Sequence, residues 1–127
     1  MQKRIYYHDT DCGGVVYYAN YLKYLEEART EYMDQRGLPV KKLAEDGVLF
    51  VVARQEIDYK SPAVYGDLID IKTTVSDIGA AKIEFVYEIK KGVEGKIIAS
   101  ARTILVCVDR DLKPQVIPDK VREKIIA

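Results

Sequence analysis

The chain has 127 residues, of which 48% are apolar and 31% charged, and we expect a single domain over residues 1–127. Lys and Arg total 20 and Asp and Glu total 20, so the formal net charge is +0. This balance gives no basic surface of the kind that binds nucleic acid or anionic membranes, and the apolar content argues against disorder.

Cysteine and histidine are too scarce to support a disulfide framework or the usual zinc ligand sets. The cysteines are Cys12 and Cys107, and His8 is the one histidine. The N-terminus lacks the apolar stretch of a signal peptide, and no run reaches the ~20 apolar residues of a membrane span. We therefore expect a cytoplasmic protein with no metal, no nucleic-acid partner and no membrane insertion.

The first third of the chain combines a strand, a turn and a long helix. We expect the strand at residues 2–8 and the turn at residues 9–14. Apolar residues at helical spacing then predict a helix over residues 18–36 with Asn20 as its N-cap. Gly37 supplies the left-handed conformation that ends such a helix.

The remainder of the chain is predicted to be mostly strands. A short helix is expected over residues 39–46, after which the apolar period changes to two, as in strands with one wet face. Strands are predicted at residues 48–60, 68–77, 82–91 and 96–109, and a short helix at 119–126. This order indicates an α+β fold with an antiparallel sheet wrapped around the long helix. Exposed sheet edges would then favour a homodimer or homotetramer.

The segment with the most candidate catalytic groups is residues 9–21, DTDCGGVVYYANY. It places Asp9 and Asp11 directly ahead of a helix N-terminus, where free backbone N–H groups and the positive end of the helix dipole point. A carbonyl held there would have its developing negative charge stabilised, and a nearby carboxylate could attack it or activate water. These parts suit acyl transfer to water, although aspartates ahead of helices commonly serve only as caps and turn residues.

Residues 6–29, YYHDTDCGGVVYYANYLKYLEEAR, resemble the signature of hotdog-fold acyl-CoA thioesterases. The match is to the 4-hydroxybenzoyl-CoA thioesterase family, most closely its Tol–Pal-associated branch. It extends to Asp58-Tyr59, Pro62, Gly66-Asp67 and Ile117-Pro118 and so covers nearly the whole chain. The resemblance implies a hotdog fold, in which a sheet wraps one long central helix, and hydrolysis of a coenzyme A thioester to free acid and CoA without a bound cofactor.

The resemblance also implies a role for each residue of the motif. Asp11 matches the essential carboxylate, acting as general base or nucleophile, while Asp9 shapes the turn. The backbone N–H of Tyr18 would polarise the thioester carbonyl. The branch often has histidine at that position, so in this chain only the backbone contribution is expected. Tyr7 matches a tyrosine that supports the acid by a hydrogen bond, although a buried strand tyrosine is an equally simple interpretation.

Two further residues are expected to bind substrate. Glu26 stands where hydroxybenzoyl-specific enzymes have an aspartate that holds the phenol, which leaves aromatic specificity open. Pairing between Glu26 and Arg29, three residues on, is the simpler expectation. Lys82 lies where relatives bring basic groups to the coenzyme's phosphates.

Other interpretations of the same residues stay open. Cys12 could act as a thiolate nucleophile helped by His8, while Cys107 is expected to be a small core residue. The fold could instead serve a non-catalytic acyl-CoA binding or scaffold protein, because a fold does not guarantee a function. An acyl-thioester hydratase or dehydratase is the third possibility, although such enzymes use a histidine in a different place.

Overall fold

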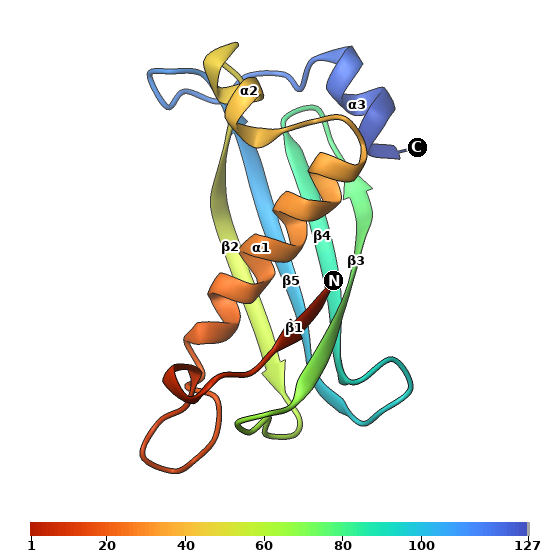
Figure 1. Ribbon diagram of the computed structural model, residues 1–127. Coiled ribbons are helices and arrows are strands. Elements are labelled where there is room, and N and C mark those ends of the chain that lie inside the picture. Colours follow the sequence, from red (N-terminus) through yellow and green to blue (C-terminus); the bar gives the residue numbers. More distant parts are fainter. Residues whose placement is uncertain (127) are drawn as a thin grey trace.

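The computed structural model describes residues 1–126 and contains one five-stranded antiparallel sheet in the order β1-β3-β4-β5-β2 (Figure 1). The strands are β1 (Gln2–Arg4), β2 (Leu49–Tyr59), β3 (Leu68–Ile78), β4 (Lys82–Lys91) and β5 (Ile97–Val108). The helices are η1 (Tyr7–Asp9, a 3₁₀ turn), α1 (Asn20–Gln35), α2 (Val40–Glu45) and α3 (Asp119–Ile126). The α+β class, the antiparallel sheet and the four long strands agree with the sequence-based prediction.

Helix α1 lies across one face of the sheet and buries its apolar stripe there (Figure 1). The buried residues of α1 are Tyr21, Tyr24, Leu25, Ala28 and Met33. Beneath them, alternate residues of β4 face the helix: Ile83, Phe85, Tyr87 and Ile89 are each at most 1% exposed. The apolar residues of α1, which recur at helical spacing, therefore pack against the apolar residues of β4, which alternate along the strand. Together they form a single apolar core.

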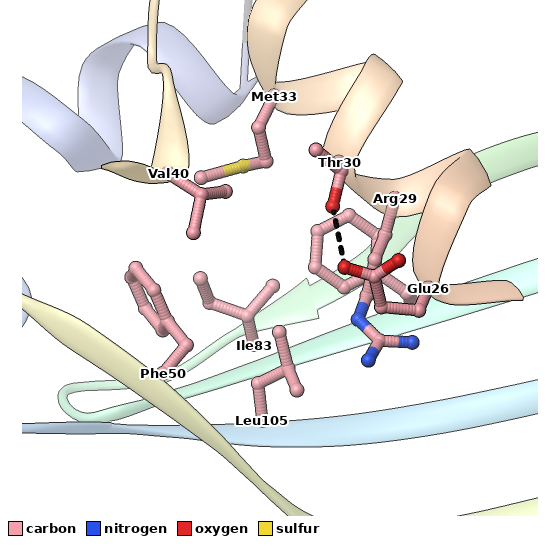
Figure 2. A pocket seen from close by; sticks show the side chains of 9 residues that line it. Glu26, Arg29, Thr30, Met33, Val40, Phe50, Ile83 and Leu105 are labelled. Atoms are coloured by element: carbon pink, nitrogen blue, oxygen red, sulfur yellow. Dashed lines mark hydrogen bonds between the residues drawn. The ribbon is translucent and has the colours of Figure 1, made fainter. Parts of the chain in front are cut away.

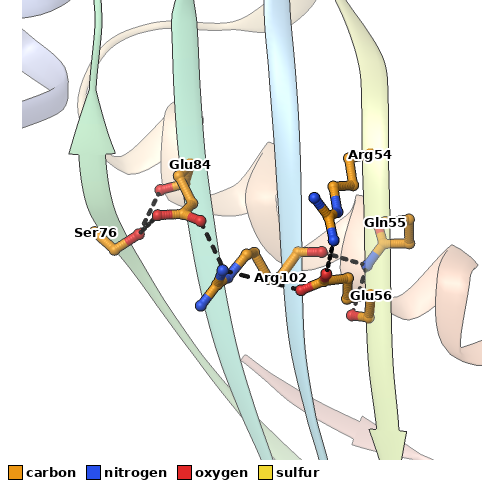
Figure 3. A network of polar contacts seen from close by, with 6 residues as sticks. All are labelled: Arg54, Gln55, Glu56, Ser76, Glu84 and Arg102. Atoms are coloured by element: carbon orange, nitrogen blue, oxygen red, sulfur yellow. Dashed lines mark hydrogen bonds and ion pairs between the residues drawn. The ribbon is translucent and has the colours of Figure 1, made fainter.

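The opposite face of the sheet carries charged side chains rather than a second apolar layer. Figure 3 shows a row of polar contacts that runs from Ser76 of β3 across the sheet to Glu56 of β2, with a helix lying behind the sheet. Arg102 of β5 is central, with its Nε 3.0 Å from Glu84 and its Nη1 3.9 Å from Glu56. Exposed ion pairs of this kind contribute little stability, so the sheet is held mainly from the α1 side.

The predicted first strand is too long, because β1 ends at Arg4 and residues 7–9 form η1 instead. The Asp9 carboxylate accepts a hydrogen bond from the Tyr6 N–H at 2.8 Å, and the Asp9 N–H donates to the Tyr6 carbonyl at 3.1 Å. These two bonds close a turn that diverts the backbone from the sheet.

Asn20 does not cap α1, contrary to the sequence-based expectation. The helix begins at Asn20, the cap position belongs to Ala19, and residue 18 lies in the preceding turn. The Asn20 amide instead donates to the Asp9 carbonyl at 2.9 Å. At the other end, Gly37 has φ +70° and the Leu38 N–H donates to the Met33 carbonyl, as predicted for the helix stop.

Strand β2 forms one edge of the sheet and contains a bulge that the sequence did not reveal. Val52 pairs with Leu105, whereas Arg54 pairs with Ile104, which leaves Ala53 as the extra residue. The outer side of β2 pairs with no strand of residues 1–126.

Within residues 1–126, no helix is both long and apolar enough to cross a bilayer.

Replacing Leu25 by alanine should destabilise the protein strongly, because Leu25 is fully buried between α1 and the sheet. Such truncations cost about 2–5 kcal/mol in free energy of unfolding. The matched control is Leu22→Ala on the same helix, where the side chain is 45% exposed, and there we expect a change within about 0.5 kcal/mol. Chemical denaturation monitored by circular dichroism measures both. Equal losses would show that α1 packs through a different face.

Candidate active site

Asp9 anchors the turn that carries the predicted acids. It is 6% exposed, and its carboxylate accepts the Tyr6 N–H described above. Its backbone carbonyl accepts two further hydrogen bonds, from the Tyr17 N–H at 3.0 Å and from the Asn20 amide at 2.9 Å. Asp9 therefore joins η1 to the start of α1, which agrees with its predicted role in shaping the turn.

The surroundings of Asp9 keep its carboxylate charged. Burial alone would raise the pKa of Asp9, but the Tyr6 N–H, the Tyr24 hydroxyl and the charges of His8 and Lys3 together lower it below 3.8. Conversely, burial and the neighbouring Asp9 carboxylate strongly raise the pKa of Tyr24, which keeps its hydroxyl protonated. Asp9 is therefore an anion, whereas the Tyr24 hydroxyl is neutral.

Asp11, the predicted base or nucleophile, lies at the surface on the tight turn that follows Asp9. Its Oδ1 accepts the Gly13 N–H at 2.8 Å, and its backbone carbonyl accepts the Gly14 N–H at 3.0 Å. A side chain at position 13 would bring its Cβ within 3.2 Å of that Oδ1. The glycine at this position thus leaves room for the carboxylate and fixes one of its oxygens.

The backbone N–H of Tyr18, the predicted carbonyl-polarising donor, has no acceptor among residues 1–126. The Ala19 N–H likewise has no acceptor in this part of the chain, whereas the Tyr17 N–H donates to the Asp9 carbonyl and the Asn20 N–H donates to the Tyr17 carbonyl. On the carbonyl side, Tyr18 accepts a hydrogen bond from the Tyr59 hydroxyl at 3.1 Å. The Tyr18 N–H shares its peptide group with the Tyr17 carbonyl, which accepts the Asn20 N–H at 2.9 Å. That peptide group is therefore held in place with its donor unused.

A groove of about 310 Å³ runs beside Tyr18 and includes Tyr59. The full lining is Val15, Val16, Tyr18, Tyr21, Tyr59, Lys60, Ser61 and Pro62. Asp11 lies outside this lining, so one chain by itself does not bring the acid and the Tyr18 amide into one closed cavity. The role of Tyr59 was missed because 41 residues separate it from its partner, and no local spacing signals such a contact.

Tyr7 is neither a buried strand tyrosine nor bonded to the predicted acid. It lies in η1, its side chain is 78% exposed, and its ring packs edge-on against Tyr65 at 5.9 Å between centroids. No hydrogen bond of its hydroxyl occurs within the described chain, so a supporting role for Tyr7 stays a prediction. His8 and Cys12 are also exposed, while Cys107 is buried as predicted.

Glu26 does not pair with Arg29. The Thr30 hydroxyl donates to Glu26 Oε1 at 3.3 Å, and no Glu26–Arg29 ion pair forms within 4 Å. All three side chains lie at one side of a cavity of about 240 Å³ between α1 and the sheet (Figure 2). The rest of its lining is apolar: Met33, Val40, Phe50, Ile83, Phe85 and Leu105. Glu26 thus stands beside an apolar cavity, although its predicted partner was wrong.

Lys82 is not brought near the other predicted site residues in a single chain. It is the first residue of β4, is exposed, and belongs to the tight turn in which the Gly79 N–H donates to the Lys82 carbonyl at 2.8 Å. That turn lies at the α3 end of the sheet, whereas α1 begins at the opposite end (Figure 1). No group of three or more His, Cys, Asp or Glu suited to a metal ion occurs in residues 1–126.

The antiparallel sheet with α1 on one face, and the acid-bearing turn ahead of that helix, define a thioesterase-like protein of the hotdog fold. The chain belongs to the thioesterase-like superfamily, whose sequence profile matches residues 6–125. The family resemblance inferred from the motif is therefore confirmed.

Individual relatives agree with this assignment. The acyl-CoA thioesterase YbgC of Haemophilus influenzae is 38% identical over 121 residues, which is 94% of this chain and 88% of that protein. A probable thioesterase from Bartonella henselae superposes with a TM-score of 0.87 at 33% identity, covering 93% of this chain and 97% of the other. A 1,4-dihydroxy-2-naphthoyl-CoA thioesterase from Synechocystis shares the fold, with a TM-score of 0.91 at 24% identity and coverage of 99% and 93%.

The lowered pKa of Asp9 predicts how stability depends on pH. Because the folded pKa lies below the unfolded value of 3.8, the contribution of the carboxylate is complete above that value and is lost as the pH falls through the folded pKa. We expect the free energy of unfolding of wild type to exceed that of Asp9→Asn by an amount that is constant above about pH 5 and shrinks towards pH 3. Denaturant titrations at several pH values measure it. Parallel curves down to pH 3 would contradict this assignment.

Proposed function

We propose that this protein is an acyl-CoA thioesterase that hydrolyses a coenzyme A thioester to the free acid and CoA. The observation that carries the proposal is a carboxylate fixed on the turn directly ahead of α1, together with a backbone N–H just before the first residue of that helix that has no acceptor in the described chain. Family membership and the thioesterase relatives support the same reaction. A thioester is already a reactive acyl donor, so the reaction needs no metal or bound cofactor.

In the proposed mechanism, Asp11 either takes a proton from a water that attacks the thioester carbonyl, or attacks the carbonyl itself to form a mixed anhydride that water then hydrolyses. In both routes the C–S bond breaks, and CoA leaves as a thiolate that takes up a proton. The negative charge that develops on the thioester oxygen is stabilised by the Tyr18 N–H and by the positive end of the α1 dipole. The Tyr17 carbonyl, which shares a peptide group with that N–H, accepts the Asn20 N–H, and the Tyr59 hydroxyl holds the next peptide group through the Tyr18 carbonyl. Tyr7 is retained as a supporting residue for the acid.

We propose that the acyl group lies in the cavity lined by Glu26, Met33 and Phe50. Glu26 follows the first residue of α1 by six positions, or about 9 Å along the helix axis, which is a suitable distance for an acyl chain that starts at the helix N-terminus. The apolar walls favour aliphatic or aromatic groups, and each methylene buried contributes about 0.8 kcal/mol.

The exposed position of Asp11 favours a site that a second copy of the chain completes. Strand β2 has a free edge and carries the exposed apolar residues Val51 and Val52, which suits pairing between copies in a homodimer or homotetramer. Lys82 would reach the coenzyme phosphates of such an assembly only from another copy. We further propose that the whole chain is one domain and acts in the cytoplasm, where CoA esters are found.

A thiol-release assay with butyryl-, octanoyl-, palmitoyl- and benzoyl-CoA tests the reaction. Wild type should release free thiol from at least one of these esters, and Asp11→Asn should lower kcat by about 10²–10⁴-fold because the base or nucleophile is lost. Cys12→Ala is the control and should keep wild-type kcat. Binding of the esters without thiol release would indicate a non-catalytic acyl-CoA protein. A loss of activity in Cys12→Ala alone would assign the nucleophile to the thiol.

Filling the cavity should change the preference for acyl length. Val40 lies at its mouth and is 42% exposed, so Val40→Phe can place a ring in the cavity without disrupting the core. Excluding about two methylenes should raise KM for octanoyl-CoA about tenfold, while KM for butyryl-CoA changes less. Val116→Phe, at a position that is 68% exposed, is the control. An unchanged ratio of the two KM values would show that the acyl group does not bind in this cavity.

A further inference from the structure

The groove beside Tyr18 and the cavity beside Glu26 extend in opposite directions from the start of α1. The cavity takes its helix residues from Glu26 to Met33, towards the C-terminal end of α1. Of that helix the groove includes Tyr21, and its other residues belong to the segment ahead of α1, the end of β2 and the segment that follows β2. A thioester with its carbonyl at the Tyr18 N–H and its acyl group in the cavity therefore has its sulfur side directed into the groove.

Two hydrogen bonds hold the walls of this groove together. The Val16 N–H donates to the Ala63 carbonyl at 2.9 Å, and the Tyr59 hydroxyl donates to the Tyr18 carbonyl at 3.1 Å. Each bond joins the segment ahead of α1 to the segment around the end of β2. The groove is therefore fixed at two points and can receive a ligand without first being ordered, which favours binding.

Among residues 1–126, Lys60 is the one charged residue that lines this groove. Its side chain is exposed and forms no ion pair within 4 Å in that range, unlike Lys91, which lies 3.3 Å from Asp67. The nearest acid in the sequence, Asp58, lines a hollow on the charged face of the sheet instead. The Lys60 N–H donates to the Ile98 carbonyl at 2.8 Å. Its backbone is thus fixed, while its ammonium group is available to an anion.

The leaving-group half of a CoA thioester matches this combination. Its pantetheine arm is a narrow chain of methylenes and amides, which suits a groove with mostly apolar and aromatic walls and one hydroxyl, that of Ser61. The arm ends in a diphosphate and a ribose phosphate, and an ammonium group binds such anions as a point charge. Lys82 lies at the opposite end of the sheet (Figure 1). Within one chain, Lys60 is therefore the cation beside the path of the arm.

We propose that the groove beside Tyr18 holds the pantetheine arm of the substrate and that Lys60 binds the CoA phosphates. The proposal rests on the proposed thioesterase function and names the residues that hold the leaving group. Lys60 lies away from the reacting atoms, so its contribution is to KM rather than to kcat. Because the ammonium group is exposed, salt weakens its attraction to a phosphate.

The test uses three thioesters of one acyl group, the one that wild type releases fastest from its CoA ester. The leaving thiols are CoA, pantetheine, which lacks the phosphates, and N-acetylcysteamine, which also lacks most of the arm. Steady-state kcat and KM are measured for wild type and for the variants Lys60→Gln, Lys60→Arg, Ser61→Trp and Lys96→Gln. Lys96 is the matched control, because it is exposed, forms no ion pair in the described chain and lies outside the groove at the same end of the sheet (Figure 1).

We expect Lys60→Gln to raise KM for the CoA ester about fivefold, as for the loss of an exposed ion pair, and to leave KM for the pantetheine ester within about twofold of wild type. The difference should shrink when the salt concentration is raised from about 50 mM to about 500 mM. Lys60→Arg keeps the charge and should recover most of the wild-type affinity. Lys96→Gln should leave the KM values for all three esters unchanged.

Blocking the groove should affect both esters that contain the arm. In Ser61→Trp the indole displaces the arm, and the lost burial of about two methylenes should raise KM about tenfold for the CoA and pantetheine esters. The rise should be smaller for the N-acetylcysteamine ester. Circular dichroism checks that the variant folds, and Val15→Trp, on the opposite wall, replaces it if Ser61→Trp does not fold.

Three outcomes would overturn the role of Lys60: an unchanged KM for the CoA ester in Lys60→Gln, an equal rise for the pantetheine ester, or an equal rise in Lys96→Gln. An unchanged KM for all three esters in the Trp variant would show that the arm does not lie in the groove. A failure of the proposed function is distinguishable, since wild type would then release no thiol from any ester. Calorimetry of free CoA needs no turnover, and it would still show whether CoA binds about fivefold more weakly to Lys60→Gln.

Discussion

The packing of α1 against the inner face of the sheet determines where every other functional group lies. Because Tyr21, Tyr24 and Leu25 must all face the sheet, the rotation of the helix about its axis is fixed. With that rotation fixed, the last turn before the helix presents its amides at one end of the sheet. The groove beside Tyr18 and the cavity beside Glu26 both follow from this placement, since each lies along a margin where α1 meets the strands.

Hydrogen bonds at the start of α1 add to the positioning that apolar packing provides. The Asn20 amide and the Tyr17 N–H both donate to the Asp9 carbonyl, and the Tyr59 hydroxyl donates to the Tyr18 carbonyl. Apolar contacts tolerate small sliding motions of a helix, whereas hydrogen bonds lose most of their strength when distance or angle changes. These bonds therefore fix the start of α1 in both distance and angle, which is the property that a site at a helix N-terminus requires.

Periodic patterns predicted most of the fold, because helical and strand spacing reflect which face is buried. The strands at 82–91 and 96–109 and the helix stop at Gly37 are examples. The strand at 2–8 failed because one carboxylate, that of Asp9, closes a turn that alternation cannot reveal. The bulge at Ala53 could not be predicted for a similar reason, since the register of β2 depends on its partner strand β5. In the proposed site, the motif indicated Asp11 and Tyr18, whereas the contact between Tyr59 and Tyr18 depends on the folded backbone and has no local signal. The pairing of Glu26 with Arg29 was wrong because helical spacing permits several partners, and Thr30 is the one that Glu26 contacts.

The aromatic residues around the start of α1 have an optical consequence. The chain contains ten tyrosines and no tryptophan, so its near-ultraviolet emission arises from phenol rings alone. Tyr18 and Tyr59 line the groove and lie 6.3 Å apart between ring centroids, and Tyr21 lies 5.6 Å from Tyr59. A molecule that enters the groove changes the polarity around these rings directly, and its arrival can be followed in the unlabelled protein by intrinsic fluorescence.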